Sequence, residues 1–191
     1  MKTASVMEVA EALRAGKVVL IPTETVVGLV SSETGLSRMQ EMKRRDPGKA
    51  VALLCSSPEE ALALARNTPL LAEKLAASFW PGPLTLVLDA PEGGTVGVRV
   101  PDHSAVRALL DSYGGPLYAT SANLSGEPAP ASLEDVDPRV SGEADLILAG
   151  EPGTGEASTV VDLSGGKIKL LRSSPDLTEE RLRRLAEDPE R

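Results

Sequence analysis

Apolar and polar positions along the chain follow two different spacings, which together predict alternating helices and strands. In residues 5–16 the apolar positions recur every three or four residues, as in an amphipathic helix. A Ser-x-x-Glu capping box opens this segment and a glycine closes it. Residues 17–21 form a short apolar run that ends at Pro22, which is typical of a buried strand.

The remaining elements follow from the same two spacings. Further helices are predicted at residues 36–42, from 57 onward, at 68–79, 104–113 and 132–140, and from 178 onward. Further strands are predicted at residues 26–30, 50–54, 85–88, 95–100, 117–120, 146–149, 159–163 and 168–171. Ser57 and Thr68 each precede a proline and are predicted to cap a helix. Because strands and helices alternate, the pattern predicts an α/β fold (α+β by some schemes), with an open, twisted, mixed sheet flanked by helices.

The size of the chain fits one domain. Its 191 residues are 41% hydrophobic and 25% charged, which is typical of a globular protein. No linker interrupts the pattern, so we expect a single domain over residues 1–186, followed by a frayed tail at 187–191.

Composition and charge restrict the partners. Aromatic residues make up 2% of the chain, which nearly excludes stacking platforms for single-stranded nucleic acid. The net charge of −8 disfavours a dedicated RNA binder, so any tRNA or RNA contact would use a local basic patch. The single cysteine, Cys55, excludes an internal disulfide, and no apolar run has transmembrane length. The N-terminal segment differs from a signal peptide, so we expect a cytoplasmic protein with no membrane partner.

The usual catalytic side chains are scarce. His103 is the single histidine, and the sequence has neither a Gly-x-Ser-x-Gly elbow, a P-loop, nor a cluster with metal-ligand spacing. If the chain is an enzyme, the nucleophile belongs to the substrate, and the protein supplies cations, backbone donors and positioning. We interpret His103 as a structural residue at a helix start, Cys55 as buried and inert, and Trp80 as a core anchor.

Three segments could bind a polar ligand, and each also has a purely structural interpretation. The cations of residues 43–49 could converge on phosphates, or they could complement the dipole at a solvated helix end. Residues 119–126 run from a strand into a loop of small polar residues, which suits either a ligand or a turn. Residues 150–159 contain glycines whose amides could approach an anion, or they form an ordinary loop.

Seven segments, taken in chain order, resemble the YrdC-like family of threonylcarbamoyl-AMP synthases. They are Pro-Thr-Glu-Thr-Val-Val-Gly-Leu at 22–29, Lys-Arg-Arg at 43–45 with Lys49, Trp-Pro-Gly-Pro-Leu-Thr at 80–85, Val-Arg-Val-Pro-Asp-His at 98–103, Ser-Ala-Asn-Leu-Ser-Gly at 121–126, Ser-Thr-Val-Val-Asp at 158–162, and Leu-Arg at 171–172. These segments cover nearly the whole chain, so the resemblance favours the ligand-binding interpretations.

The resemblance implies a YrdC/RibB-like fold with a wide concave cleft. It implies a nucleotidyltransferase that converts L-threonine, bicarbonate and ATP into L-threonylcarbamoyladenylate and pyrophosphate. Mg²⁺ would accompany ATP, without a tightly bound protein metal site. The product would pass to a downstream tRNA threonylcarbamoyl transferase, which modifies the adenosine beside the anticodon.

The resemblance also assigns roles to individual residues. The catalytic set is Lys43, Arg45, Ser121 and Asn123. The L-threonine set is Thr23, Thr25, Arg99, Ser121 and Ser158, with Arg99 as the partner of the carboxylate. The ATP set is Lys43, Arg45, Lys49, Thr95, Asn123, Ser132 and Arg172. On this basis, Lys43→Ala or Arg45→Ala should reduce activity far more than stability.

The sequence departs from the family pattern at several places. The stretch between Leu29 and Lys43 is shorter than usual, Asp46 replaces a proline, and Leu54 stands where many members have a histidine. Two alternatives therefore remain beside the synthase. One is a non-catalytic RNA-binding or regulatory module, and the other is a different carbamoyl or adenylyl transfer on the same scaffold. From glycine content alone, residues 151–156 are predicted to form a mobile lid.

Overall fold

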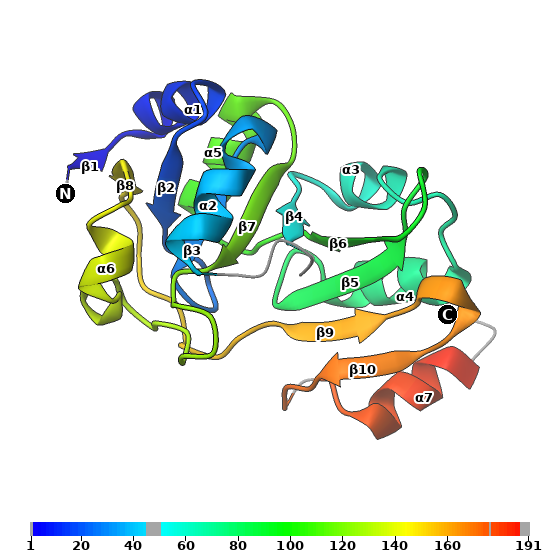
Figure 1. The fold of residues 1–191 in the computed structure, drawn as a ribbon. Coiled ribbons are helices and arrows are strands. Elements are labelled where there is room, and N and C mark those ends of the chain that lie inside the picture. Colours follow the sequence, from blue (N-terminus) through cyan, green and yellow to red (C-terminus); the bar gives the residue numbers. More distant parts are fainter. Residues whose placement is uncertain (1, 45–50, 176, 188–191) are drawn as a thin grey trace.

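The computed structural model describes residues 2–44, 51–175 and 177–187, and these residues form one ten-stranded sheet with helices on it (Figure 1). The strands are β1 Thr3–Ala4, β2 Val18–Ile21, β3 Gly28–Ser31, β4 Ala52–Leu54, β5 Leu84–Asp89, β6 Thr95–Arg99, β7 Leu117–Ser121, β8 Leu146–Leu148, β9 Thr159–Asp162 and β10 Lys169–Arg172. The helices are α1 Val6–Arg14, α2 Leu36–Met42, α3 Pro58–Ala63, α4 Leu70–Phe79, α5 Ser104–Tyr113, α6 Pro138–Ser141 and α7 Glu179–Glu187, with 3-10 turns at Glu33–Gly35, Leu133–Asp135 and Ser164–Gly166.

The sheet is open and mixed, as predicted. The strand order is β1-β8-β2-β3-β7-β4-β6-β5-β9-β10. Strands β2, β3, β7 and β4 are successively antiparallel, whereas β4 and β6 are parallel, as are β5 and β9. Strands β9 and β10 form an antiparallel pair.

In one half of the sheet both faces are covered by helices, because the strands there are apolar on both sides. On β2, Val19 and Ile21 pack against α1 and α5, whereas Val18 and Leu20 pack against α2 and α6. Figure 1 shows α1, α2 and α5 gathered around β2, β3 and β7. All four β2 side chains are buried, in agreement with the prediction of a buried strand.

In the other half the two faces differ. Leu84, Leu86 and Leu88 on β5 pack in one core cluster with residues of α3, α4 and α7. Thr85 and Val87 alternate with these leucines and point to the opposite face, where they line a cleft. The period-two alternation of β5 therefore separates a core face from a ligand-accessible face.

Several local predictions are confirmed. Ser5 caps α1, and its amide donates a hydrogen bond to the Glu8 carboxylate at 2.9 Å, which completes the capping box. Ser57 caps α3. Trp80 is buried in the core beside α4, and its indole Nε1 donates to the Leu84 carbonyl at 2.7 Å.

Other local predictions are wrong. The helix predicted at 132–140 is a 3-10 turn followed by α6, because Pro138 has no amide to continue the first turn and begins a new helix capped by Asp137. Thr68 does not cap α4, whose N-cap is Pro69; the Thr68 hydroxyl instead contacts the Leu62 carbonyl at 3.5 Å. Strand β1 had no sequence signal, since two residues are too few to show a period.

The chain end differs slightly from the prediction. Helix α7 includes Glu187, the first residue of the predicted frayed tail, and residues 188–191 lie outside the described residues. The single domain over residues 1–186 remains our proposal. No helix in the described ranges combines the length and the apolar character needed to cross a membrane.

Cys55 is fully buried at the end of β4, as predicted. Burial, assisted by the charge of Glu60, raises the pKa of its thiol to about 12. An exposed thiol titrates near 9, so the folded protein keeps a proton that the unfolded chain loses, and this group lowers stability as the pH rises from about 9 to about 12. We expect an aromatic disulfide reagent at neutral pH to label Cys55 only after urea unfolding. Rapid labelling of the native protein would contradict its burial.

Candidate functional site

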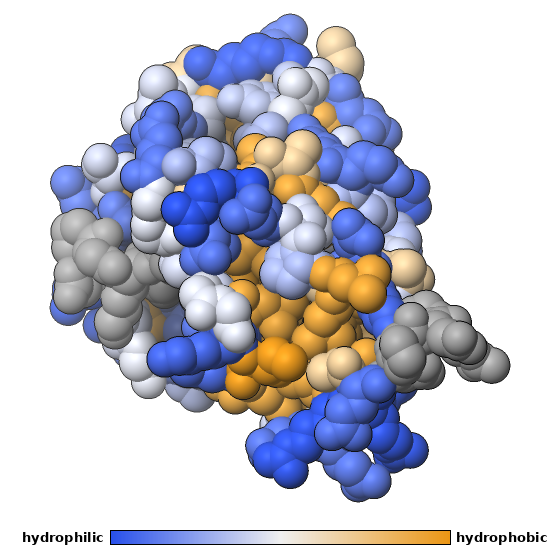
Figure 2. Space-filling model, turned by 90° about the vertical axis from the view of Figure 1, so that its right-hand side faces the viewer, coloured by the Kyte–Doolittle hydropathy of each residue, from blue (hydrophilic) through white to orange (hydrophobic). Residues whose placement is uncertain are grey.

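A cleft of about 400 Å³ lies on the open face of the sheet. Its floor crosses strands β3, β7, β4, β6 and β5. Small residues at the centre of the floor, among them Ala52, Gly97 and Ala119, leave the space that larger side chains would fill. On the side of the molecule shown in Figure 2, apolar side chains gather in one area with hydrophilic side chains around it. Leu171, which is 59% exposed, belongs to the lining of the cleft.

The loop after β2 presents two buried threonines to the cleft. The Thr23 hydroxyl donates to the Val26 carbonyl at 2.7 Å and accepts from the Thr25 amide at 3.2 Å. The two threonine hydroxyl oxygens are 2.8 Å apart. Since the Thr23 hydrogen is directed at Val26, Thr25 donates to Thr23, and the loop holds both side chains in fixed positions.

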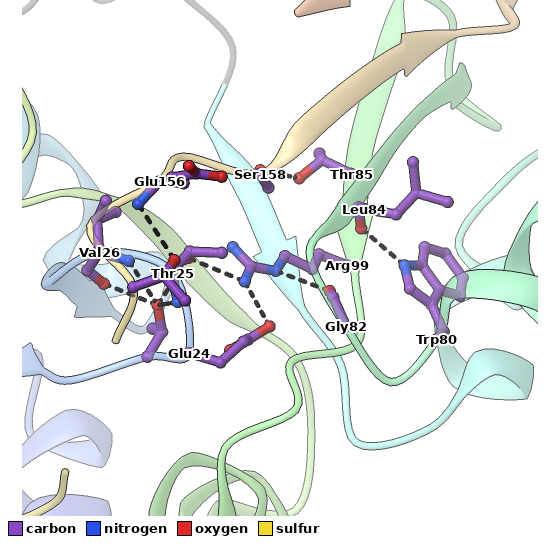
Figure 3. A network of polar contacts seen from close by, with 12 residues as sticks. Glu24, Thr25, Val26, Trp80, Gly82, Leu84, Thr85, Arg99, Glu156 and Ser158 are labelled. Atoms are coloured by element: carbon purple, nitrogen blue, oxygen red, sulfur yellow. Dashed lines mark hydrogen bonds and ion pairs between the residues drawn. The ribbon is translucent and has the colours of Figure 1, made fainter. Parts of the chain in front are cut away.

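Arg99 lies at the end of β6, is 7% exposed, and is held from several directions (Figure 3). Its Nη2 donates to Glu24 Oε1 at 2.6 Å and to Thr25 Oγ1 at 3.0 Å, and its Nε donates to the Gly82 carbonyl at 3.3 Å. Within the described residues, Nη1 makes no hydrogen bond. Arg99 lines the cleft, so this nitrogen can meet an anion there.

A second guanidinium and a serine form the wall next to Arg99. Ser158 Oγ lies 3.0 Å from Thr85 Oγ1 and accepts a hydrogen bond from Arg172 Nη2 at 3.0 Å. Burial lowers the pKa of Arg172, and the charge of Arg99 lowers it further. Arg99 and Arg172 both line the cleft, which therefore favours an anionic ligand.

Lys43 is brought to the loop after β7. Lys43 is 1% exposed. Its ammonium donates to the Ser121 carbonyl and to the Asn123 carbonyl, the latter at 2.6 Å. The Asn123 amide in turn donates to the Glu127 carbonyl at 2.6 Å. The interpretation as a solvated helix end is wrong for Lys43, although the adjacent Arg44 is exposed. Three of the four predicted catalytic residues are therefore clustered.

The predicted site residues other than Lys43 and Asn123 fall into three groups. Those that line the cleft are Thr23, Thr25, Arg99, Ser121, Ser158 and Arg172. Thr95 and Ser132 lie outside its lining: Thr95 is exposed at the start of β6, and the Ser132 hydroxyl donates to Asp135 at 2.9 Å. Arg45, Asp46 and Lys49 lie outside the described residues. The role of each residue remains a prediction.

Sequence reasoning missed two residues that support the site. Glu24 pairs with Arg99, and Thr85 contacts Ser158. The available signals were the position of Glu24 between the two threonines and the alternation of Thr85 with the core leucines of β5.

For residues 150–159 the sequence allows either an anion site or an ordinary loop, and the structure shows where two of the amides are bonded. The amides of Thr154 and Gly155 donate to the carbonyls of Glu24 and Thr25, at 3.0 and 2.7 Å. These two donors are therefore used within the protein. In the described part of the chain, no three His, Cys, Asp or Glu side chains come together as a metal site.

Comparison with known proteins places this chain in a family. Residues 11–174 match the model of the Sua5/YciO/YrdC family, which is described as "Telomere recombination". A protein of Pyrococcus abyssi named threonylcarbamoyl-AMP synthase is 40% identical over 173 residues, which are 84% of this chain and 51% of that protein. A Vibrio vulnificus (strain YJ016) protein of the same name is 36% identical over 163 residues, covering 78% of this chain and 88% of its own length.

The same similarity is found among solved structures. The crystal structure of P. abyssi Sua5 complexed with L-threonine superimposes with a TM-score of 0.85 at 35% identity, over 94% of this chain and 56% of that one. The chain thus spans about half the length of the P. abyssi relative. The family match, the identities and the resemblance of the seven segments agree that the chain belongs to the Sua5/YciO/YrdC family.

Proposed function

We propose that the chain is an L-threonylcarbamoyladenylate synthase, a nucleotidyltransferase that uses L-threonine, bicarbonate and ATP. Relatives from P. abyssi and V. vulnificus that carry the name threonylcarbamoyl-AMP synthase support this proposal. The complex of P. abyssi Sua5 with L-threonine supports the choice of amino acid. The product would serve a tRNA threonylcarbamoyl transferase in the cytoplasm.

The observation that carries the proposal is the fixed guanidinium of Arg99 in the cleft. Glu24, Thr25 and the Gly82 carbonyl hold it, and its Nη1 is left for a carboxylate. The hydroxyls of Thr25 and Ser158 line the same cleft and can bind the polar groups of a small amino acid. This arrangement supports the set that the family resemblance assigns to L-threonine, namely Thr23, Thr25, Arg99, Ser121 and Ser158, and we propose the same set here.

The chemistry requires no protein nucleophile. Bicarbonate gives CO₂ and hydroxide. The threonine amine adds to the carbon of CO₂ and loses a proton, which the hydroxide takes up to form water, and the carbamate oxygen then attacks the α-phosphorus of ATP. The bond from that phosphorus to the pyrophosphate oxygen breaks, and pyrophosphate leaves with its electron pair. Lys43 and Arg45 would offset the negative charge, with Ser121 and Asn123 as neighbouring polar groups.

The family resemblance also assigns residues that would bind ATP. Lys43, Arg45, Lys49 and Asn123 would bind ATP, with Thr95, Ser132 and Arg172 as further candidates. Mg²⁺ would enter bound to ATP, as part of the substrate. RNA could contact the chain through the basic residues of the cleft.

Pyrophosphate release tests the proposal. The purified chain is incubated with ATP, bicarbonate and Mg²⁺, with and without L-threonine, and L-serine replaces threonine in a matched reaction. We expect release that requires threonine and that serine supports less well. The same reaction without bicarbonate should release no pyrophosphate beyond the background.

The opposite result separates the alternatives. If folded protein releases no pyrophosphate in response to threonine, the synthase proposal is wrong. Threonine-independent release with another carbamoyl or adenylyl acceptor would indicate a different transfer reaction. Tight RNA binding without any turnover, measured by fluorescence anisotropy, would indicate the non-catalytic module.

A further inference from the structure

Residues 150–156, called the strap, connect β8 to the wall of the cleft. The strap starts just after β8 and leads directly into Ala157 and Ser158, which line the cleft. It lies against the loop that carries Thr23, Glu24 and Thr25. The strap therefore touches one wall of the cleft along its length and becomes the other wall at its end.

The strap and this loop approach each other too closely for side chains. The Thr154 amide donates to the Glu24 carbonyl, and the Gly155 amide donates to the Thr25 carbonyl. A Cβ at Gly153 would lie 2.3 Å from the Thr23 carbonyl oxygen, so an alanine there would force the two segments apart. The glycine content of this segment, which predicts a mobile lid, is thus also explained by close contact between the two backbones.

His103 contacts the beginning of the strap. It occupies the N-cap position of α5 but makes no capping hydrogen bond with its side chain. Its Nε2 instead lies 3.0 Å from the Glu151 carbonyl. A carbonyl can only accept, so Nε2 carries the hydrogen and donates. A Cβ at Gly150 would lie 2.7 Å from both the imidazole and the ring of Pro22, so the strap is packed against both.

The hydrogen bond from His103 to Glu151 holds the imidazole ring and the beginning of the strap together. The buried Nδ1 of His103 has no partner in the described part of the chain, so the bond to Glu151 is the one polar interaction that orients the ring there. Glu151 lies between Gly150 and Gly153, which allow the backbone to move once the bond is lost. Movement of the strap would displace Thr25, which contacts Arg99, and Ser158, which contacts Arg172.

We infer that His103 is a positioning residue for the amino-acid half of the cleft. It fastens the beginning of the strap to the start of α5, and the strap, through its bonds to Glu24 and Thr25 and its continuation into Ser158, keeps Thr25 and Ser158 in place in the cleft. This inference rests on the proposed function, because it assigns the threonine side of the same site. It does not involve contact between His103 and substrate.

Two substitutions at this position test the inference. His103→Ala removes the donor, whereas the amide of His103→Gln can still donate to the Glu151 carbonyl. One hydrogen bond is worth about tenfold in an equilibrium constant, so we expect His103→Ala to raise the KM for threonine about tenfold. The KM for ATP should stay unchanged, and His103→Gln should restore most of the threonine affinity.

Hydrogen exchange supplies a readout that does not depend on turnover. The amides of Thr154 and Gly155 should exchange faster in His103→Ala than in the wild type, and His103→Gln should slow them again. Gly153→Ala displaces the strap without touching the imidazole and should weaken threonine binding in the same way. Gly115→Ala is its control, since a Cβ at Gly115 meets nothing within 4 Å.

The outcomes distinguish this inference from the proposed function. A wild-type chain that binds no threonine in calorimetry overturns both. If the wild type binds threonine, unchanged affinity in folded His103→Ala, or in Gly153→Ala should the first variant not fold, overturns only the inference. Equal losses for threonine and ATP in His103→Ala, without rescue by glutamine, would show a general structural role and also overturn it.

Discussion

Arg99→Met is expected to reduce threonine binding by roughly a hundredfold or more, because it removes the guanidinium that faces the cleft. The affinity for ATP should change little, since the predicted phosphate ligands Lys43, Arg45 and Lys49 remain. Arg99→Lys retains the charge but cannot bond Glu24, Thr25 and Gly82 at once, so it should restore only part of the affinity. Calorimetric titration with threonine and with ATP measures both effects.

A loss of stability has to be separated from this loss of binding. The Arg99 and Glu24 side chains are 9% and 19% exposed, and removing Arg99 alone leaves a largely buried carboxylate without its cation. Such a change costs about 3 kcal/mol. The double variant Arg99→Met/Glu24→Gln removes both charges and should recover most of the stability in urea unfolding. It should still fail to bind threonine, and wild-type affinity in that variant would disprove the carboxylate role of Arg99.

Lys43→Ala is expected to reduce both turnover and stability. Loss of a cation beside the phosphates should lower kcat by roughly a hundredfold to a thousandfold. The sequence alone predicts that this substitution reduces activity far more than stability. The structure adds a clear loss of stability, because Lys43 is buried and bonded to the carbonyls of Ser121 and Asn123. Loss of its ammonium should cost about 1–3 kcal/mol. Pyrophosphate release and urea unfolding measure the two effects separately.

Arg44→Gln provides the matched control. Arg44 follows Lys43 directly and is exposed, and its substitution by glutamine removes the same unit of charge. We expect its turnover and stability to stay near those of the wild type. If Arg44→Gln reduced turnover as much as Lys43→Ala, the general charge of the segment would matter, and the specific role of Lys43 would be refuted.

Local patterns predicted most elements because their causes are local. The capping box at Ser5 and Glu8 satisfies the helix amides from within one turn, and the same residues form it in the structure. The alternation in β5 follows from the strand geometry itself. The failures also have local causes: Pro138 interrupted a predicted helix, and the two-residue strand β1 was too short to show a period.

The cleft depends on pairing between distant segments. β4 and β6 place Leu54 beside Arg99, and β3 and β7 place Gly28 beside Ser121. No spacing within any one of these strands indicates its neighbour. The resemblance to the family supplied the list of residues, and the pairing of the strands, with the loops that join them, brought six of them to the cleft.

The sequence by itself determined the class of fold, the position of most helices and strands, and the family, because periodicity, capping and motif order are properties of short segments. The tertiary structure decided how the candidate residues are used. It buried Lys43 on the loop after β7, paired Arg99 with Glu24 across 75 positions, and laid the strap across Thr23 and Thr25. These contacts join segments far apart in the chain, so their energies depend on the packing of the whole sheet and leave no local pattern in the sequence.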